Sequence, residues 1–414
     1  MNDRPAQSPP GAARLTRRGL LVGGAAAAGV SGAALWGIAN NPEQGRPVSF
    51  GSEPVPFYGA RQAGIETAPQ SHANFVGLDL RPDSGRDAGD AVPAVLKLWT
   101  TDAARLTQGL PALADTEPEL ALRPARLTVT VGLGPALFDR LGMDRLRPSS
   151  ARELPPFATD RLESRWRPTD FLLQICADDP MVVAHATRVL VKDVRSLAVE
   201  RWRQTGFRTA RAAGPDGETA RNLMGQVDGT VNPVAGTTDF DEVVFDDGNP
   251  QPWLAGGTLM VLRRIRMNLD TWDQLDRQSR ELAVGRRLDN GAPLTGTRET
   301  DPVDITAMRD GIPVIPPNAH VALAHPHQPA ERFLRRPYNY DEPPAAGETS
   351  ESGLIFTAYQ RDIDRQFLPV QRRLAQFDAL NRWTTAIGSA VYVLPPGVRP
   401  GGYVGEQLFG DTAG

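Results

Sequence analysis

The segment GQVDGTVNP, residues 225–233, sets a single acid between two glycines and ends in Asn-Pro. Gly225 and Gly229 let the backbone turn sharply and leave room for a flat partner to approach the chain. Asp228, held on such a turn, needs a partner or a shifted pKa if it is withdrawn from water. Because Asp, Gly, Asn and Pro are also the ordinary residues of surface turns, this segment alone leaves a structural turn as open as a functional site.

Two later segments, NAHVALAHP (318–326) and FLRRPYNY (333–340), change the interpretation. Together with the first segment they resemble the dye-decolorizing peroxidases, a family of haem peroxidases. The resemblance covers nearly all of the chain after about residue 55. It continues in order through PQSHANFVGLDL (69–80), LQICADDPMVVAHATR (173–188), PWLAGGTLMVLRRIRM (252–267), GRRLDNGAPLTG (285–296) and GLIFTAYQRD (353–362).

The local patterns of the chain indicate an α+β protein, because strand-like and helix-like segments alternate with strands in pairs. Strands are expected at 72–80, 125–134, 171–177, 257–269, 353–360 and 390–396, and helices at 92–109, 136–142, 182–199, 270–285 and 367–387. Periodicity turns Trp272, Leu275 and Leu282 toward the core. It likewise places Phe367, Val370, Leu374 and Phe377 on one face of the last helix.

The family resemblance implies a more specific fold of two ferredoxin-like domains, each an antiparallel sheet with flanking helices, with haem b in the second. On this basis residues 1–45 are a signal peptide with its linker, residues 46–215 the N-terminal domain, and residues 216–414 the C-terminal haem-binding domain.

The N-terminus carries the features of an export signal. Thr16-Arg17-Arg18-Gly19-Leu20-Leu21 has the form of a twin-arginine motif, and an Ala/Gly-rich apolar stretch follows it. Gly37-x-Ala39 offers a small-x-small cleavage site, although a membrane anchor is the alternative interpretation. We therefore expect an exported protein, outside the cell or in the periplasm or cell envelope, that engages the twin-arginine translocase.

Composition excludes several other classes. The chain has 414 residues, ample for a packed core, and a net charge of -4, which disfavours nucleic acid as a partner. Cys176 is the single cysteine, so neither an internal disulfide nor a cysteine-based metal centre can form. Its apolar surroundings predict a buried, inert thiol.

A haem peroxidase needs an axial iron ligand, a group that moves a proton between the peroxide oxygens, and a positive charge. In the resemblance, His320 matches the iron ligand, Asp228 the distal acid and Arg335 the distal arginine, with Arg336 as its alternative. His325 is the rival histidine, whereas His72 and His185 are expected to be structural or solvated.

Further residues are expected around the cofactor. The resemblance implies that Leu354 and Phe356 wall the distal pocket. Arg286 is a candidate partner for a haem propionate, with Arg263, Arg264 and Arg287 as competing candidates. The remaining cofactor-binding residues in the resemblance are Gly229, Thr230, Val231, His325, Pro326 and His327. The chain departs from the family pattern at Ala322, Pro337 and Arg61, none of which removes a catalytic group.

We therefore expect hydrogen peroxide and small aromatic donors such as dyes and phenolics as substrates. The alternatives are an exported iron-handling (deferrochelatase-like) haem protein and a non-catalytic haem carrier; assembly into a homo-oligomer stays open. Because the pocket would be too closed for bulky donors, electrons would leave through oxidisable residues at the surface. The candidates, for which ordinary packing is the competing interpretation, are Tyr338, Tyr340, Tyr359, Trp253 and Trp383.

Overall fold

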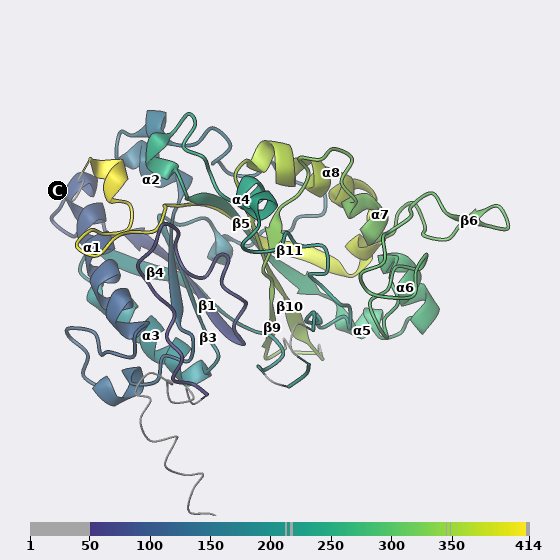
Figure 1. The fold of residues 1–414 in the computed structure, drawn as a ribbon, viewed down its shortest axis with the longest axis horizontal. Coiled ribbons are helices and arrows are strands. Elements are labelled where there is room, and N and C mark those ends of the chain that lie inside the picture. Colours follow the sequence, from purple (N-terminus) through teal and green to yellow (C-terminus); the bar gives the residue numbers. More distant parts are fainter. Residues whose placement is uncertain (1–49, 212, 216–217, 345, 348, 411–414) are drawn as a thin grey trace, which may run out of the picture. The chain divides into compact units, whose positions relative to one another are not determined.

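A computed structural model describes residues 50–410 except 212, 216, 217, 345 and 348 (Figure 1). The twin-arginine motif and the predicted cleavage site lie outside the described residues. Within residues 50–410, no helix combines the length and the apolar character needed to cross a membrane.

Nine strands form one antiparallel sheet in the order β5-β11-β2-β3-β1-β4-β9-β10-β8, and an additional pairing of β5 with β10 closes it. The predicted combination of antiparallel strands with helices is confirmed, as one closed sheet. The bounds are β1 His72–Leu80, β2 Thr128–Leu133, β3 Phe171–Ala177, β4 Ala198–Phe207, β5 Thr258–Met267, β8 Leu334–Arg335, β9 Tyr338–Glu342, β10 Glu351–Gln360 and β11 Thr384–Leu394.

The two halves of the chain contribute separate arcs of this sheet. The first half supplies β2-β3-β1-β4, and the second supplies β11-β5-β10-β9. The arcs meet through single residue pairs, Val393 with Leu133 and Phe207 with Asn339. Each half therefore hydrogen-bonds mainly within itself, and the seams between them are narrow.

Helices lie outside the sheet (Figure 1). In the first half, α1 (Ala88–Leu106) connects β1 to β2, and α3 (Pro180–Asp193) connects β3 to β4. In the second half, α5 (Leu269–Trp272), α6 (Arg277–Val284) and α7 (His320–Ala324) follow β5, and α8 (Leu368–Phe377) follows β10. The remaining elements are α2 (Pro135–Arg140), α4 (Thr238–Val244) and a hairpin of β6 (Met308–Arg309) and β7 (Ile312–Pro313).

Strand alternation divides the core into layers. One core cluster contains side chains from strands of both halves, among them Phe75, Leu172, Met260 and Tyr392. Cys176 is buried in this cluster, as predicted. On the other side of the first arc, α1 and α3 pack on the sheet, and the indole of Trp99 donates to the carbonyl of Leu190 over 2.8 Å.

Several predicted boundaries are wrong. The helix expected at 182–199 ends at Asp193, and after a turn β4 begins at Ala198, a strand that the sequence analysis missed. The helix expected at 270–285 is two short helices, and Leu282 is exposed where burial was expected. The helix expected at 367–387 ends at Phe377, whose side chain is 59% exposed, and β11 begins at Thr384.

Candidate active site

His320 is the first residue of α7, and a carboxylate fixes its ring. The imidazole Nδ1 lies 2.6 Å from Oδ2 of Asp378, which follows the last residue of α8. The other carboxylate oxygen, Oδ1, accepts a hydrogen bond from the Leu380 amide over 2.9 Å. Because Asp378 is anchored at both oxygens, it holds the imidazole in one orientation and leaves Nε2 as the nitrogen free to bind a metal.

The side chain of His320 is largely desolvated by the protein but remains partly accessible. Burial lowers the pKa of His320, whereas the charge and the hydrogen bond of Asp378 raise it. The effects of Asp378 together outweigh burial, so the pKa of His320 lies above its ordinary value. Arg335 lowers the same pKa and Asp228 raises it, which places both within electrostatic reach of the ring. Although burial desolvates the ring, 35% of the His320 side chain is accessible, so a ligand can reach it.

A second charged pair lies in the same site. Nη1 of Arg335 donates to Oδ1 of Asp228 over 2.8 Å, and both side chains are mostly buried. The side chain of Asn232 joins the loop of Asp228 to the strand of Arg335. Its Nδ2 donates to the Arg335 carbonyl over 2.7 Å, and its Oδ1 accepts from the Arg335 amide over 3.0 Å. The acid and the guanidinium are therefore held as one unit.

Glu299 supports the loop of Asp228 from the other side. Its Oε1 accepts hydrogen bonds from the hydroxyls of Thr219, over 2.6 Å, and Thr230, over 2.8 Å. Its backbone carbonyl accepts from Arg286 over 3.0 Å. Burial, followed by the neighbouring charge of Arg335, lowers the pKa of Arg286. Arg286, which the sequence analysis considered for a propionate, thus lies beside the charged pair.

The apolar wall of the site comes from β10. Leu354 and Phe356 alternate on one face of the strand and pack with the cluster that contains Trp272 and Leu380. Gly229 has φ +134°, a conformation that side chains rarely adopt, so the loop needs glycine here. Val231 is 70% exposed, which leaves its side chain available to a ligand or to solvent.

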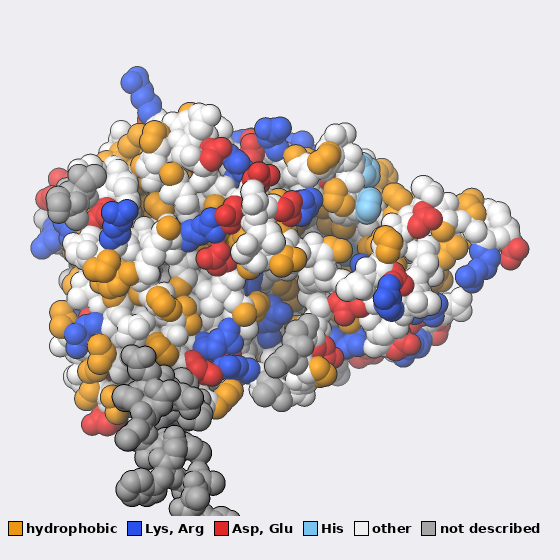
Figure 2. All heavy atoms as spheres, viewed as in Figure 1, with side chains coloured by type: hydrophobic (Ala, Val, Ile, Leu, Met, Phe, Trp, Pro, Cys, Tyr) orange, Lys and Arg blue, Asp and Glu red, His pale blue; other side chains and the backbone are white. Residues whose placement is uncertain are grey.

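The segment after α7 is anchored to α8. Arg373 donates to the carbonyls of Leu323 and His325 and forms an ion pair with Glu331. Pro326 and His327 are exposed, and His325 is partly so. In Figure 2, histidine side chains reach the surface at the end of the second half that carries α7. The imidazole of His320, although partly accessible, is directed at the buried carboxylate of Asp378.

The other arginine and histidine side chains considered for the site lie away from it. Arg336 is 2% exposed and donates to Gln70 and to the Thr67 carbonyl, on the side of the chain opposite to the Arg335–Asp228 pair. His185 is buried and contacts Asp115 over 3.1 Å, as a structural histidine does. His72 is partly buried in β1, and burial lowers its pKa.

Most of the residues predicted to carry electrons at the surface are in fact buried. Tyr338, Tyr340 and Tyr359 are 0% exposed, because they point into the core that the two arcs share. They cannot touch a bulky donor. Trp253 is 8% exposed, whereas Trp383 is partly exposed and packs edge-on against Trp272, with ring centroids 5.3 Å apart.

The donor set fits a haem. One imidazole with a free Nε2 lies within electrostatic reach of an acid–arginine pair, and the apolar residues of β10 belong to the cluster that contains Leu380. Among the described residues, no group of three or more His, Cys, Asp or Glu side chains could hold a metal ion by itself. A single imidazole is what haem iron takes from a protein as its proximal ligand, and His320 can supply it.

Sequence reasoning missed Asp378, Glu299 and Asn232. Asp378 lies 58 residues from His320, and the sequence carries no spacing that links the two. Asn232 was part of the quoted motif, and its turn-forming chemistry concealed its role as a bridge to Arg335.

Comparison with known proteins covers both halves. The model of the Dyp-type peroxidase N-terminal region matches residues 62–208, and that of the C-terminal region matches residues 219–399. The chain is 40% identical to a dye-decolorizing peroxidase of Thermobifida fusca, over 95% of this chain and 97% of the relative. It is 34% identical to a deferrochelatase of Yersinia pseudotuberculosis, over 86% and 84%. The crystal structure of a DyP-type peroxidase from Cellulomonas bogoriensis superposes with a TM-score of 0.83 at 51% identity, covering 87% of this chain and 99% of that one.

Proposed function

The chain belongs to the Dyp-type peroxidase family of haem enzymes, and we propose that it reduces hydrogen peroxide and oxidises dyes, phenolics or similar one-electron aromatic donors. One observation carries the proposal: the His320–Asp378 pair and the Asp228–Arg335 pair interact electrostatically within one site. In such a site His320 can bind a metal, and Asp228 and Arg335 can act on the peroxide.

His320 would bind the iron of haem b through Nε2. Asp378 makes the imidazole a stronger electron donor by accepting a hydrogen bond from its Nδ1–H group. The haem, when bound, supplies the redox chemistry. The loop Gly229-Thr230-Val231 would bring backbone near its plane, with Leu354 and Phe356 as the apolar wall. His325, Pro326 and His327 would line its edge.

Asp228 would act as the general acid and base. Its carboxylate takes a proton from hydrogen peroxide and returns it to the departing oxygen. Arg335 would stabilise, through its positive charge, the negative charge that develops as the O–O bond breaks. Asn232 positions both, because it fastens the Asp228 loop to the backbone of Arg335.

Stopped-flow absorbance of the holoenzyme with hydrogen peroxide tests these roles. Asp228→Asn keeps the size of the side chain but removes its base, and we expect the second-order rate to fall roughly 10²- to 10⁴-fold. Arg335→Gln removes the charge, and we expect a fall of roughly 10²- to 10³-fold. A matched control is Arg152→Gln, because Arg152 forms an exposed ion pair with Asp364 over 2.8 Å. Rates equal to that of the wild type in both site variants would refute the assignment.

The second candidate function is iron release from haem. Relatives covering 86% of this chain are named deferrochelatase, and the same pocket could hold haem for that purpose. An anaerobic incubation of the holoenzyme without peroxide decides between the functions, with porphyrin fluorescence as the measurement. Appearance of metal-free porphyrin would support iron release. Unchanged haem, together with fast reaction with peroxide, supports the peroxidase and excludes a passive carrier.

Donor oxidation would use Trp383. It is partly exposed and touches Trp272, which belongs to the same cluster as Leu354 of the pocket wall. Trp383→Phe should slow oxidation of a bulky dye several-fold and leave the peroxide rate unchanged. Equal dye turnover in both proteins would show that electrons leave elsewhere.

We also propose that each half is one ferredoxin-like domain, residues 46–215 and 216–414. The strand orders β4-β1-β3-β2 and β11-β5-β10-β9, with helices after the first and third strands, support this division. Residues 1–45 would direct export through the twin-arginine translocase. Fractionation of cells that express the Arg17→Lys, Arg18→Lys variant tests export, and unchanged export would contradict it.

A further inference from the structure

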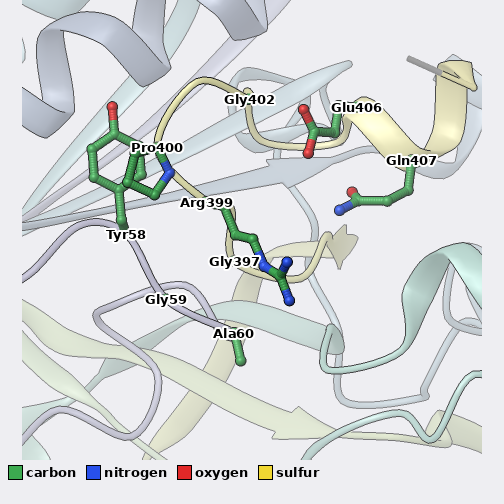
Figure 3. Close-up of a pocket in the computed structure, with 9 residues that line it drawn as sticks. All are labelled: Tyr58, Gly59, Ala60, Gly397, Arg399, Pro400, Gly402, Glu406 and Gln407. Atoms are coloured by element: carbon green, nitrogen blue, oxygen red, sulfur yellow. The ribbon is translucent and has the colours of Figure 1, made fainter. Parts of the chain in front are cut away.

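A cavity of about 610 Å³ lies apart from the haem site, and none of the haem-site residues lines it. The segment 58–60, before β1, forms one side, and residues 397–407, after β11, form the other (Figure 3). This volume is in the range of roughly 300–1,000 Å³ that small-molecule sites occupy. The cavity therefore has the size of a ligand site, and the peroxidase chemistry assigns it no role.

The floor of the cavity is rigid. The Gly59 amide donates to the Val398 carbonyl over 3.0 Å, and the Gly397 amide donates to the Ala60 carbonyl over 3.1 Å. A Cβ atom on Gly397 would lie 2.3 Å from the Gly59 carbonyl oxygen, so the two backbones touch. The two walls are thus fixed to one another before any ligand arrives.

Opposite charges line the cavity without pairing with each other. Figure 3 shows the side chains of Arg399 and Gln407 extending toward one another across the cavity. Within the described part of the chain, the guanidinium of Arg399 has no hydrogen-bond or ion-pair partner. Glu406 is 9% exposed, and its Oε2 accepts from the Tyr403 amide over 3.1 Å. A Cβ on Gly402 would lie 2.2 Å from that carboxylate, which shows how closely Glu406 is seated.

An apolar surface completes the site. The ring of Tyr58 is 38% exposed and lines the cavity, as Pro400 of the other segment does (Figure 3). Tyr58 is braced edge-on by Phe57, with ring centroids 5.5 Å apart. An aromatic ligand ring can therefore pack against a fixed aromatic surface.

We propose that this cavity binds an aromatic carboxylate that carries a hydroxyl group. The carboxylate pairs with the planar fork of Arg399, with Gln407 as a further donor. The ring packs on Tyr58, and the hydroxyl donates to the carboxylate of Glu406. The exposed guanidinium of Arg399 can pair with an anion, the carboxylate of Glu406 can accept a donor in addition to the Tyr403 amide, and the Tyr58 ring lines the same cavity. This binding involves no redox step and does not depend on the haem.

Isothermal titration of the holoenzyme with 4-hydroxybenzoate tests the proposal. A ligand of this size should bind with a Kd of roughly 0.1–1 mM. Arg399→Gln should weaken binding roughly 10- to 100-fold, because a charge-assisted bidentate contact is lost. Arg123→Gln, an exposed arginine that does not line the cavity, should bind as the wild type does.

Two analogues and one spectrum sharpen the test. Methyl 4-hydroxybenzoate lacks the anion and 4-methoxybenzoate lacks the donor, so both should bind more weakly than the parent, and Glu406→Gln should reduce the preference for the hydroxyl. Binding should leave the Soret band unchanged, and Arg399→Gln should leave the peroxide rate unchanged. Absence of binding to the wild type at 5–10 times the expected Kd, or equal affinity in Arg399→Gln, would overturn the proposal. Neither result bears on the peroxidase assignment, which rests on the reaction of the haem with peroxide.

Discussion

Replacing Asp378 by asparagine removes the negative charge beside His320 but keeps an oxygen that can accept a hydrogen bond from the Nδ1–H group. The hydrogen bond is 2.6 Å long in the wild type, and the carboxylate is 4% exposed, so solvent screens it little. A hydrogen bond to a charged group contributes about 1.5–3 kcal/mol, against about 0.5–1.5 kcal/mol for a neutral one. The asparagine variant should therefore lose about 1–1.5 kcal/mol, which corresponds to roughly 10-fold weaker binding of haem.

The alanine variant separates charge from hydrogen bonding. Asp378→Ala leaves the Nδ1 proton of His320 and the amide of Leu380 without their partner. An unsatisfied buried donor costs about 1–3 kcal/mol, so the total loss should approach 3 kcal/mol, or roughly 100-fold in affinity. Both values lie within the 10- to 100-fold that partners of metal-bound histidines usually contribute.

Transfer of haem to an excess of apomyoglobin measures the dissociation rate. We expect the order wild type, Asp378→Asn, Asp378→Ala, with the rate increasing by about a factor of ten at each step. Circular dichroism and urea unfolding must show that both variants are folded, and Asp364→Asn, in an exposed ion pair, controls for loss of a surface charge. If both folded variants release haem at the wild-type rate, Asp378 only ends α8 and does not support the ligand.

Three further predictions follow from particular contacts. Glu299→Ala should slow the reaction with peroxide roughly 10-fold at an unchanged Soret band, because it releases the loop of Asp228; stopped-flow rates within twofold of the wild type would contradict this. Burial, and then the neighbouring Asp102, raises the pKa of Asp193 to about 7, so the folded state binds the extra proton and loses stability as the pH rises from about 4 through 7. In Asp193→Asn, the unfolding free energy measured in urea should change with pH across this range by on the order of 1 kcal/mol less than in the wild type, after solvent screening. A pH profile parallel to that of the wild type would show that the pKa of Asp193 is not raised. Gly285→Ala should destabilise the protein by about 2–4 kcal/mol, since φ is +88° and the new Cβ would lie 2.2 Å from Val321; an unchanged urea midpoint would show that α6 and α7 adjust at no cost.

The strands that the sequence predicts well are those with uniform burial. FLLQICA is buried along its whole length, and β3 has the predicted bounds of 171–177. The same holds for β1, in which eight of nine residues are buried. An apolar run of this length between turn residues is characteristic of a covered strand, so neighbours in space add little information.

The sequence analysis missed β4 because one face of the strand is buried and the other carries exposed polar and charged side chains. Its sequence AVERWRQTGF turns Trp202, Gln204 and Gly206 inward, and exposes Arg201 and Arg203. Gln204 is buried because its amide reaches Glu342 over 2.9 Å, a contact 138 residues away in the chain. A polar strand of this kind is indistinguishable from the end of a charged helix until its partner strands are known.

The end of α8 shows the same limit. Helical periodicity in 367–387 continues past Phe377, but Asp378 leaves the helix, and its side chain accepts from Leu380 and meets His320. The tertiary contact therefore determines where the helix ends. The error in the helix boundary and the omission of Asp378 from the predicted site have one cause, since both depend on a partner 58 residues away.

The two sides of the site are built independently of each other. Asp228 and Arg335 are held together by their ion pair and by Asn232, which attaches the loop to the strand paired with β10. His320 and Asp378 depend instead on the contact between α7 and α8. The charges of Arg335 and Asp228 reach His320, as their effects on its pKa show, and the apolar cluster of Leu354 and Leu380 lies between the two sides. The geometry between iron ligand and proton carrier is therefore set by the sheet and helices behind them, because no direct bond between the pairs could set it.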